Sequence, residues 1–372
     1  MVLVGGSLAA VVAAGLAPAA TAKAAAQDWP PFVLVSGLLL VGMVARDEGL
    51  FDQAGAVLAR IGRNGPLLLV ATAVVVAVVT VTLNLDTSVT FLTPVVLAAA
   101  RALRRHPEPF LYLVVAMSNG ASLLLPGSNL TNLIVLQDAH RSGASLVSRV
   151  GTAWLAAVVA VVAVVALVHR RRIVETGPRS EPQSPPPTAR PWPAALGIAA
   201  CVAAMLALAA AVAAVVVLAV GVALAAAPGS RGRARELARE RLGQLNAPLL
   251  TGLLGAACAL GALGRVWSGP ATLLAHAGPW QTAGVGAAAT AVVNNLPAAS
   301  LLAARPVAHA AALLVGLNLG PNLTVWGSLA GVLWAQAARG AGWQPSARRL
   351  SLFGLAMVPA TMAAALGALS IR

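Results

Sequence analysis

The feature that most constrains the fold is a pair of short polar interruptions that occurs twice in an otherwise apolar sequence. The first half contains Asn84-Leu-Asp86 and Pro126-Gly-Ser-Asn129, and the second half contains Asn294-Asn295-Leu-Pro297 and Trp326-Gly-Ser328. Backbone at membrane depth leaves helical geometry only where it is buried in protein or lines a cavity. Paired interruptions in corresponding places are typical of the substrate site of a secondary transporter built from repeats. The pattern therefore predicts two related membrane halves around one site.

Composition agrees with a protein that lies within a bilayer. Of the 372 residues, 59% are hydrophobic and 10% are charged, whereas a soluble domain carries about a quarter charged residues. The abundant Ala and Gly allow close helix packing, which membrane helices need because water cannot drive their association. We expect an all-α polytopic protein with roughly nine or ten spanning helices plus two hairpins. We also expect it to lie in a bacterial inner membrane.

Several function classes are not expected. The net charge of +14 comes from basic residues in short connectors, where they act as topology signals, so nucleic-acid binding is not predicted. Cys201 and Cys258 lie in apolar runs without His or Cys companions, which favours buried hydrophobic roles over a metal site or a disulfide. No phosphate-binding loop or hydrolase motif is present. We therefore expect no enzymatic activity and no cofactor.

The sequence divides into two repeats and a linker. The first repeat covers 1–170, with a re-entrant hairpin at 67–103 and a broken helix at 110–139; the second covers 194–372, with a hairpin at 280–304 and a broken helix at 307–337. Between them, 171–193 is a Pro/Ser/Arg-rich cytoplasmic loop. The first hairpin's arms, Leu67–Leu83 and Ser88–Leu103, have 17 and 16 residues, short for spans of about 20. These lengths favour re-entrant arms.

Four further segments complete the expected layout. Val2–Leu16 reads as an uncleaved first helix rather than a signal peptide, because it has no basic segment before it. Phe32–Val44 is predicted as the second span. The 34-residue run Ala194–Ala227 is too long for one helix and predicts two short ones joined by a tight turn. The basic segment Arg231–Asn246 is predicted to lie at the membrane interface.

The positive-inside rule orients this layout, because arginines collect in cytoplasmic connectors. With both hairpins re-entrant, five arginine groups fall on one side: Arg46/Arg60/Arg63, Arg101/Arg104/Arg105, Arg170–Arg190, Arg231–Arg241 and Arg339/Arg348/Arg349. The first hairpin then enters from the cytoplasm and the second from outside, so the repeats are inverted. Counting the arms as full spans gives the same sidedness; the arm lengths and polar tips therefore carry the re-entrant prediction.

Two hairpin tips and two helix breaks satisfy their backbone only if they converge, which gathers helix N-termini and uncharged polar side chains around one small volume. Asp86 is the one carboxylate expected at membrane depth, where an ionisable group is normally functional. It is predicted to exchange the coupling proton, although it also suits the cap of the helix that begins at Ser88.

The predicted transport and substrate-binding residues are polar side chains of the tips and breaks. They are Asn84, Asp86, Thr87, Ser128, Asn129, Asn294, Asn295, Asn318 and Ser328. The asparagines of the tips either cap hairpin helices or bind solute. Asn119 and Asn318 either face the site or bond neighbouring helices. No Arg or Lys falls at a tip or break, which favours a solute without charge at neutral pH.

These motifs resemble the arsenite efflux permeases of the ion-transporter superfamily. Those permeases carry an Asn-Asp hairpin followed by Leu-Thr-Pro and then a Ser-Asn-Leu-x-Asn break; the corresponding segments here are Leu83–Pro94, Leu125–Ile134, Val293–Pro297 and Asn318–Ala330. The chain departs from the family at Leu85, which separates Asn84 from Asp86. The resemblance implies proton-driven efflux of arsenite or antimonite as neutral hydroxides, with a soluble ATPase partner in some relatives.

Three alternatives remain open from the residues. The chain is otherwise a sodium-coupled symporter of di- or tricarboxylates or other anions, a sodium/proton antiporter, or a membrane subunit without transport of its own. An antiporter usually needs more buried carboxylates than one. A homodimer is the expected assembly.

Overall fold

The computed structural model describes residues 2–136, 143–176, 192–208, 210–226 and 247–371. Its regular elements are helices, and the only β-type pairing in these ranges is an isolated bridge between Arg105 and Thr176. Among the described residues, five helices are long and apolar enough to cross a membrane: α2 (Pro18–Asp47), α4 (Gly65–Thr82), α8 (Gly143–Val168), α13 (Ala247–Val266) and α19 (Ala347–Ser370). The predicted all-α membrane fold is confirmed.

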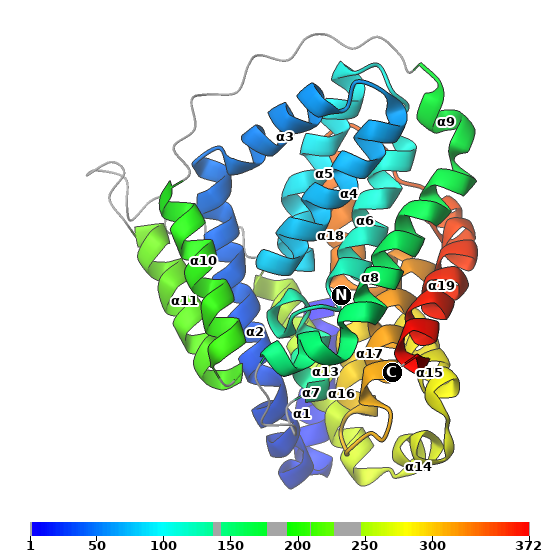
Figure 1. Cartoon of the computed structure of the whole chain (residues 1–372). Helices are drawn as coiled ribbons and strands as arrows, with labels where there is room; N and C mark the ends of the chain where they lie inside the picture. Colours follow the sequence, from blue (N-terminus) through cyan, green and yellow to red (C-terminus); the bar gives the residue numbers. More distant parts are fainter. Residues whose placement is uncertain (1, 137–142, 177–191, 209, 227–246, 372) are drawn as a thin grey trace.

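The two halves contain the same series of elements. The first series is α4, α5 (Leu85–Ala102), α6 (Glu108–Ala121), the short 3₁₀ turn η1 (Pro126–Ser128), α7 (Leu130–Leu136) and α8. The second is α15 (Pro279–Val293), α16 (Asn295–Leu302), α17 (Ala310–Leu319), the 3₁₀ turns η3 (Gly320–Leu323) and η4 (Val325–Gly327), α18 (Leu329–Gly340) and α19. The hairpin α4–α5 occupies the upper half of Figure 1 and α15–α16 the lower half.

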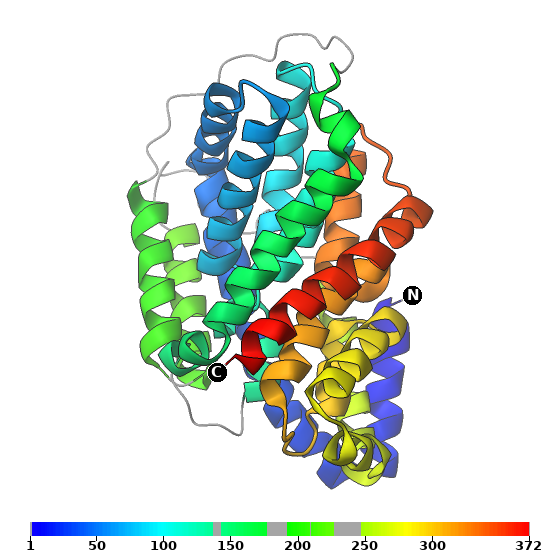
Figure 2. The same ribbon diagram turned by 45° about the vertical axis from the view of Figure 1, so that its right-hand side comes forward.

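The remaining helices flank these two series. They are α1 (Val2–Leu16), α2, α3 (Leu50–Ile61), α9 (Arg170–Val174), α10 (Trp192–Ala207), α11 (Ala210–Ala226), α13 and the short α14 (Gly269–His276). The predicted split of the long apolar run is confirmed as α10 and α11, which stand together at one side in Figures 1 and 2. The sequence did not predict α14. Helix α2 packs against α11 and α13, and α1 packs against α13.

The predicted second span, Phe32–Val44, is too short. Helix α2 runs for 30 residues and continues through Pro30 and Pro31. A proline inside a helix removes one backbone hydrogen bond and crowds the preceding turn. Here both prolines are buried, and packing against neighbouring helices keeps the helix continuous. As a consequence Asp28 lies inside a helix, and Asp86 is not the only buried carboxylate.

Arginines from three of the five predicted cytoplasmic groups meet at one end of the molecule. The Arg101 guanidinium donates to the carbonyl oxygens of Ala341 and Gly342, at 3.0 and 2.9 Å. Arg172 forms an ion pair with Glu108, and Arg349 lies 3.7 Å from the same carboxylate. These contacts agree with a shared side for those groups. Residues 177–191 of the predicted loop, 137–139 of the first broken helix and the predicted interfacial segment 231–246 lie outside the described residues.

Candidate functional site

The tip of the first hairpin lies between α4 and α5. The backbone at Asn84 is extended, and its Oδ1 accepts a hydrogen bond from the Thr87 amide at 2.7 Å, which caps α5. Asp86 follows in the first turn and is 1% exposed. Asn84 Nδ2, Asp86 Oδ1 and Thr87 Oγ1 are buried without a hydrogen-bond partner among the described residues. The tip is therefore capped by one atom of Asn84 and still presents three polar atoms.

The second tip, between α15 and α16, is built in a similar way. Asn294 adopts φ 77°, a backbone conformation that residues other than glycine rarely adopt. The turn is therefore strained and needs support from neighbouring groups. Its Oδ1 accepts from the Leu296 amide at 3.3 Å, and its Nδ2 donates to the Trp326 carbonyl oxygen at 2.8 Å. The buried Oδ1 of Asn295 has no partner among the described residues. Asn294 thus ties the tip to the second break, while Asn295 offers an acceptor.

The first break is tied to the first hairpin. After α6 ends at Ala121, the chain forms the 3₁₀ turn of Pro126–Ser128 before α7 begins. Ser128 Oγ donates to the Val81 carbonyl oxygen of α4 at 3.1 Å, and Asn129 Oδ1 accepts from the Thr131 amide at 3.1 Å. In the second break, Ser328 Oγ accepts from the Gly331 amide at 3.1 Å and so caps α18.

Asn318 joins the two breaks. Its Oδ1 accepts from Ser122 Oγ at 2.7 Å and from Asn129 Nδ2 at 2.8 Å, while its Nδ2 donates to Asn132 Oδ1 at 2.9 Å. The structure therefore brings the two breaks together and attaches each tip to the break of its own half. Both oxygen and nitrogen of the Asn318 amide are engaged by protein groups, which fits the helix-bonding role better than the solute-facing one.

The network also contains residues that the sequence did not single out, and it includes Asn119, for which a site-facing and a helix-bonding role were both left open. Asn119 Nδ2 donates to Asn322 Oδ1 at 2.8 Å, and Ser118 Oγ donates to Ser88 Oγ at 3.2 Å, which links α6 to the first hairpin. Asn132 and Ser122 complete the central network. The available signal was spacing: Ser118 and Ser122, and separately Asn318 and Asn322, lie four residues apart, which places each pair on one side of a helical turn.

The electrostatic character of the site comes mainly from backbone. Helices α5, α16 and α18 begin at a tip or at the second break, and the N–H groups of a first helical turn favour negative charge. Neither described tip nor described break contains Arg or Lys, and Asp86 is the ionisable side chain there. The site thus combines donors suited to anionic or oxygen-rich groups with one carboxylate suited to a cation.

A surface groove leads toward the first tip. It encloses about 390 Å³ between α5 and α18 and is lined by Thr90, Pro94, Leu333 and Gln336, among others. Thr90 Oγ1 donates to the Asp86 carbonyl oxygen at 2.7 Å, so the groove begins one turn beyond Asp86.

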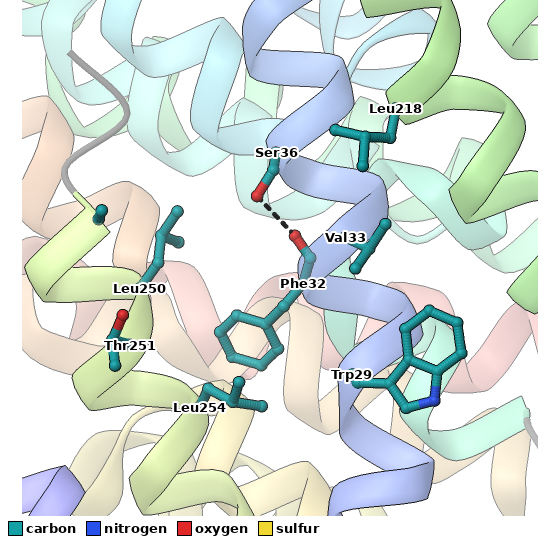
Figure 3. A pocket seen from close by; sticks show the side chains of 9 residues that line it. Trp29, Phe32, Val33, Ser36, Leu218, Leu250, Thr251 and Leu254 are labelled. Carbon is teal, nitrogen blue, oxygen red and sulfur yellow. Dashed lines mark hydrogen bonds between the residues drawn. The ribbon is translucent and has the colours of Figure 1, made fainter. Parts of the chain in front are cut away.

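A second cavity, of about 310 Å³, lies between α2, α11 and α13 and away from the tips and breaks. Figure 3 shows it lined mainly by apolar side chains such as Phe32 and Leu250. Its hydroxyl group on Ser36 donates to the Phe32 carbonyl oxygen at 2.8 Å. Within the described ranges, no three His, Cys, Asp or Glu side chains gather in a way that could hold a metal ion.

The sequence and the structure were compared with those of known proteins. Over residues 1–331 the sequence matches the family model described as CitMHS, citrate transporter. A comparison with curated proteins gave no match. Among solved structures, the Alcanivorax borkumensis YdaH transporter, described as having an unusual topology, superposes with a TM-score of 0.58 at 16% identity and covers 95% of this chain and 87% of its own. That likeness shows a shared fold.

The family match corrects part of the earlier interpretation. It supports a transporter rather than an enzyme, and it favours the anion-symporter alternative over the arsenite permease that the motifs resembled. No comparison supports the arsenite branch specifically. On its match over most of its length, this chain belongs to the CitMHS citrate transporter family.

Proposed function

We propose that the chain is a secondary active transporter that moves a small multivalent carboxylate anion, with citrate as the first candidate, together with cations. The observation that carries this proposal is the family match over residues 1–331. The chemistry of the site also supports this proposal, because helix N-termini provide donors for carboxylate oxygens and the buried Asp86 provides a binding position for a cation.

Charge balance supports symport with cations. Citrate carries about three negative charges at neutral pH, and an unpaired charge at membrane depth is strongly unfavourable. The described tips and breaks bring no Arg or Lys to offset these charges, and an ionised Asp86 adds another negative charge. The anion therefore needs cations beside it. The proposal assigns one of them, a proton or a sodium ion, to Asp86.

The predicted site residues divide into two groups under this proposal. Asn84, Thr87 and Asn295 have buried polar atoms without a hydrogen-bond partner among the described residues, and they are proposed to contact the anion or its cation. Ser128, Asn129, Asn294, Asn318 and Ser328 make hydrogen bonds that hold the tips and breaks in place. The hairpins and broken helices of two inverted repeats, 1–170 and 194–372, are proposed to carry the solute in an elevator-like cycle.

Arsenite or antimonite efflux is the second candidate function. The lack of Arg and Lys at the tips and breaks suits an uncharged hydroxide, and the four motifs resemble the arsenite permeases. A bacterial inner membrane is the proposed location. The homodimer and the soluble ATPase partner stay predictions.

The experiment uses purified protein in liposomes and radiolabelled citrate. Uptake is measured under an inward sodium gradient, an inward proton gradient and no gradient, and arsenite transport is measured in the same preparations. Citrate accumulation that needs one of the two gradients supports the proposal and identifies the cation. Arsenite transport without citrate transport would replace the proposal with the second candidate.

A further inference from the structure

A second polar cluster, separate from the tips and breaks, lies where α2, α13 and α16 meet. Ser300 Oγ on α16 donates to Asp28 Oδ1 on α2 at 2.9 Å. Beside it, Gln27 Nε2 donates to one carbonyl oxygen of α7 and one at the end of α16, at 3.0 and 3.2 Å. Arg265 on α13 donates to Gln27 Oε1. Polar groups thus connect helices whose surrounding contacts are apolar.

Asp28 stands out within this cluster. It is fully buried, as is Ser300, and its second carboxyl oxygen, Oδ2, has no hydrogen-bond partner among the described residues. A buried carboxylate with one oxygen unsatisfied is unfavourable in its ionised form, whereas a protonated carboxyl is neutral. Ionisable side chains inside membrane segments are commonly retained for function, including proton relays.

Within the part of the chain that the structure describes, few charged or titratable groups lie around Asp28. Helix α13 brings Arg265 and Cys258 within electrostatic reach, and α16 brings the Ser300 hydroxyl. Helices α1, α7, α10 and α11 also pack against α2 and contain no Asp, Glu, His, Lys or Arg. On α2 itself, Lys23 is exposed. Helices α3 and α5 also pack against α2, and their charged residues are Asp52, Arg60, Asp86 and Arg101.

Two of these features favour a proton over a metal cation as the occupant. Gln27 Oε1 already accepts from Arg265, which removes a potential ligand oxygen. The positive charge of the guanidinium would also repel a sodium ion, whereas it would assist release of a proton by stabilising the carboxylate. Asp86 lies far from this cluster, because its neighbour Thr87 faces Gly42, fourteen residues or about 21 Å along α2 from Asp28.

We propose that Asp28 carries a proton in the transport cycle, as a second coupling residue beside Asp86. In the loaded state Oδ2 binds the proton and Ser300 donates to Oδ1; on release, the carboxylate is stabilised by Arg265. Ser300 lies on α16, which begins at the second tip, so a movement of that hairpin changes the partner of Asp28. This inference rests on the proposed function, because it adds a coupling proton at Asp28 to the cation that the proposed cycle assigns to Asp86.

The test compares wild type with Asp28→Asn, which keeps the size of the side chain and an acceptor for Ser300. Each proton coupled to uptake multiplies the citrate accumulation ratio about tenfold per pH unit of gradient at zero membrane potential. Asp28→Asn is therefore expected to lower that ratio about tenfold, while exchange of labelled for unlabelled citrate without a gradient is retained. Asp52→Asn, on the exposed side of α3, is the matched control and should behave as wild type.

An unchanged accumulation ratio in Asp28→Asn would overturn the proposal. So would a wild type that exchanges citrate and responds to sodium but not to protons, although the proposed function would then stand. Failure of wild type to exchange citrate would instead refute the proposed function alone.

An infrared pH titration of the purified protein decides the question without transport. The carbonyl stretch of a protonated carboxyl should appear on acidification in wild type and lose one component in Asp28→Asn. Ser300→Ala should move the midpoint of that component to higher pH, because the ionised carboxylate loses a hydrogen-bond donor. Identical spectra for wild type and Asp28→Asn would overturn the assignment. This arm also covers the case in which a variant transports poorly because it is misfolded.

Discussion

Replacing Asn318 by alanine should lower the stability of the junction between the two halves rather than act directly on the chemistry of the site. Asn318 makes hydrogen bonds to Ser122, Asn129 and Asn132, and each net hydrogen bond contributes about 1 kcal/mol in soluble proteins and about 0.6 kcal/mol between membrane helices. Ser122 keeps its bond to the Asn119 carbonyl oxygen, but Asn132 Oδ1 would have no other partner among the residues that the structure describes. An orphaned buried acceptor costs about 1–3 kcal/mol. The expected loss of unfolding free energy is therefore about 3 kcal/mol.

The assay is unfolding of the purified variant in detergent, followed by circular dichroism. The matched control is Asn64→Ala, because Asn64 is exposed and caps α4 with a single bond to the Leu67 amide at 2.9 Å. That cap should contribute about 1 kcal/mol. If Asn318→Ala is no less stable than Asn64→Ala, the hydrogen bonds between the two breaks do not hold the halves together, and the reasoning is wrong.

Asn295, Gly6 and His169 each give a further prediction. Asn295→Ala should change stability by less than about 1 kcal/mol but lower citrate uptake at least about tenfold, because Asn295 Oδ1 has no partner in the described part of the chain; wild-type uptake would remove Asn295 from the site. Gly6→Val should destabilise the protein by about 1–3 kcal/mol in detergent, since a side chain at Gly6 would collide with the Gly252 carbonyl, and an unchanged melting temperature would refute this close packing of α1 and α13. Burial lowers the pKa of His169 below its ordinary 6.5, so the unfolded chain takes up the proton first and stability should fall as pH drops below about 6.5; His169→Phe should lose part of that acid sensitivity, and equal sensitivity would contradict the assignment.

Much of the fold was predictable because irregular backbone with unsatisfied polar groups is energetically unfavourable in a bilayer. The two tips and two breaks were found from short polar runs in apolar surroundings, and α10 and α11 were found because a run of 34 residues exceeds one span. Length and polarity are local properties, so the sequence carries them directly.

The packing partners were not predictable in the same way. Prolines inside a helix usually interrupt it, and the packing of α2 against its neighbours keeps that helix continuous through Pro30 and Pro31 and places Asp28 inside it. Likewise, the sequence gives no sign that Asn132 and Asn322 form hydrogen bonds to the other half of the chain. Which acceptor a buried amide finds depends on a helix that lies far away in the sequence.

The substrate inference shows how one local signal can mislead. The lack of Arg and Lys at the tips and breaks favoured an uncharged solute, but the family match favours an anion. Helices α5, α16 and α18 begin at these places and supply donors without a charged side chain. The missing positive charge is instead expected from co-transported cations, which makes coupling a requirement for binding rather than an addition to it.

The central claim is that Asp86, buried at the first tip, takes up a cation that allows the anion to enter. The most direct measurement is citrate uptake into liposomes under an inward proton or sodium gradient, with Asp86→Asn compared with wild type and with Asp52→Asn. The account predicts that gradient-driven uptake is lost in Asp86→Asn and retained in Asp52→Asn, with all three proteins folded in the membrane. Gradient-driven uptake by Asp86→Asn equal to that of wild type would contradict it.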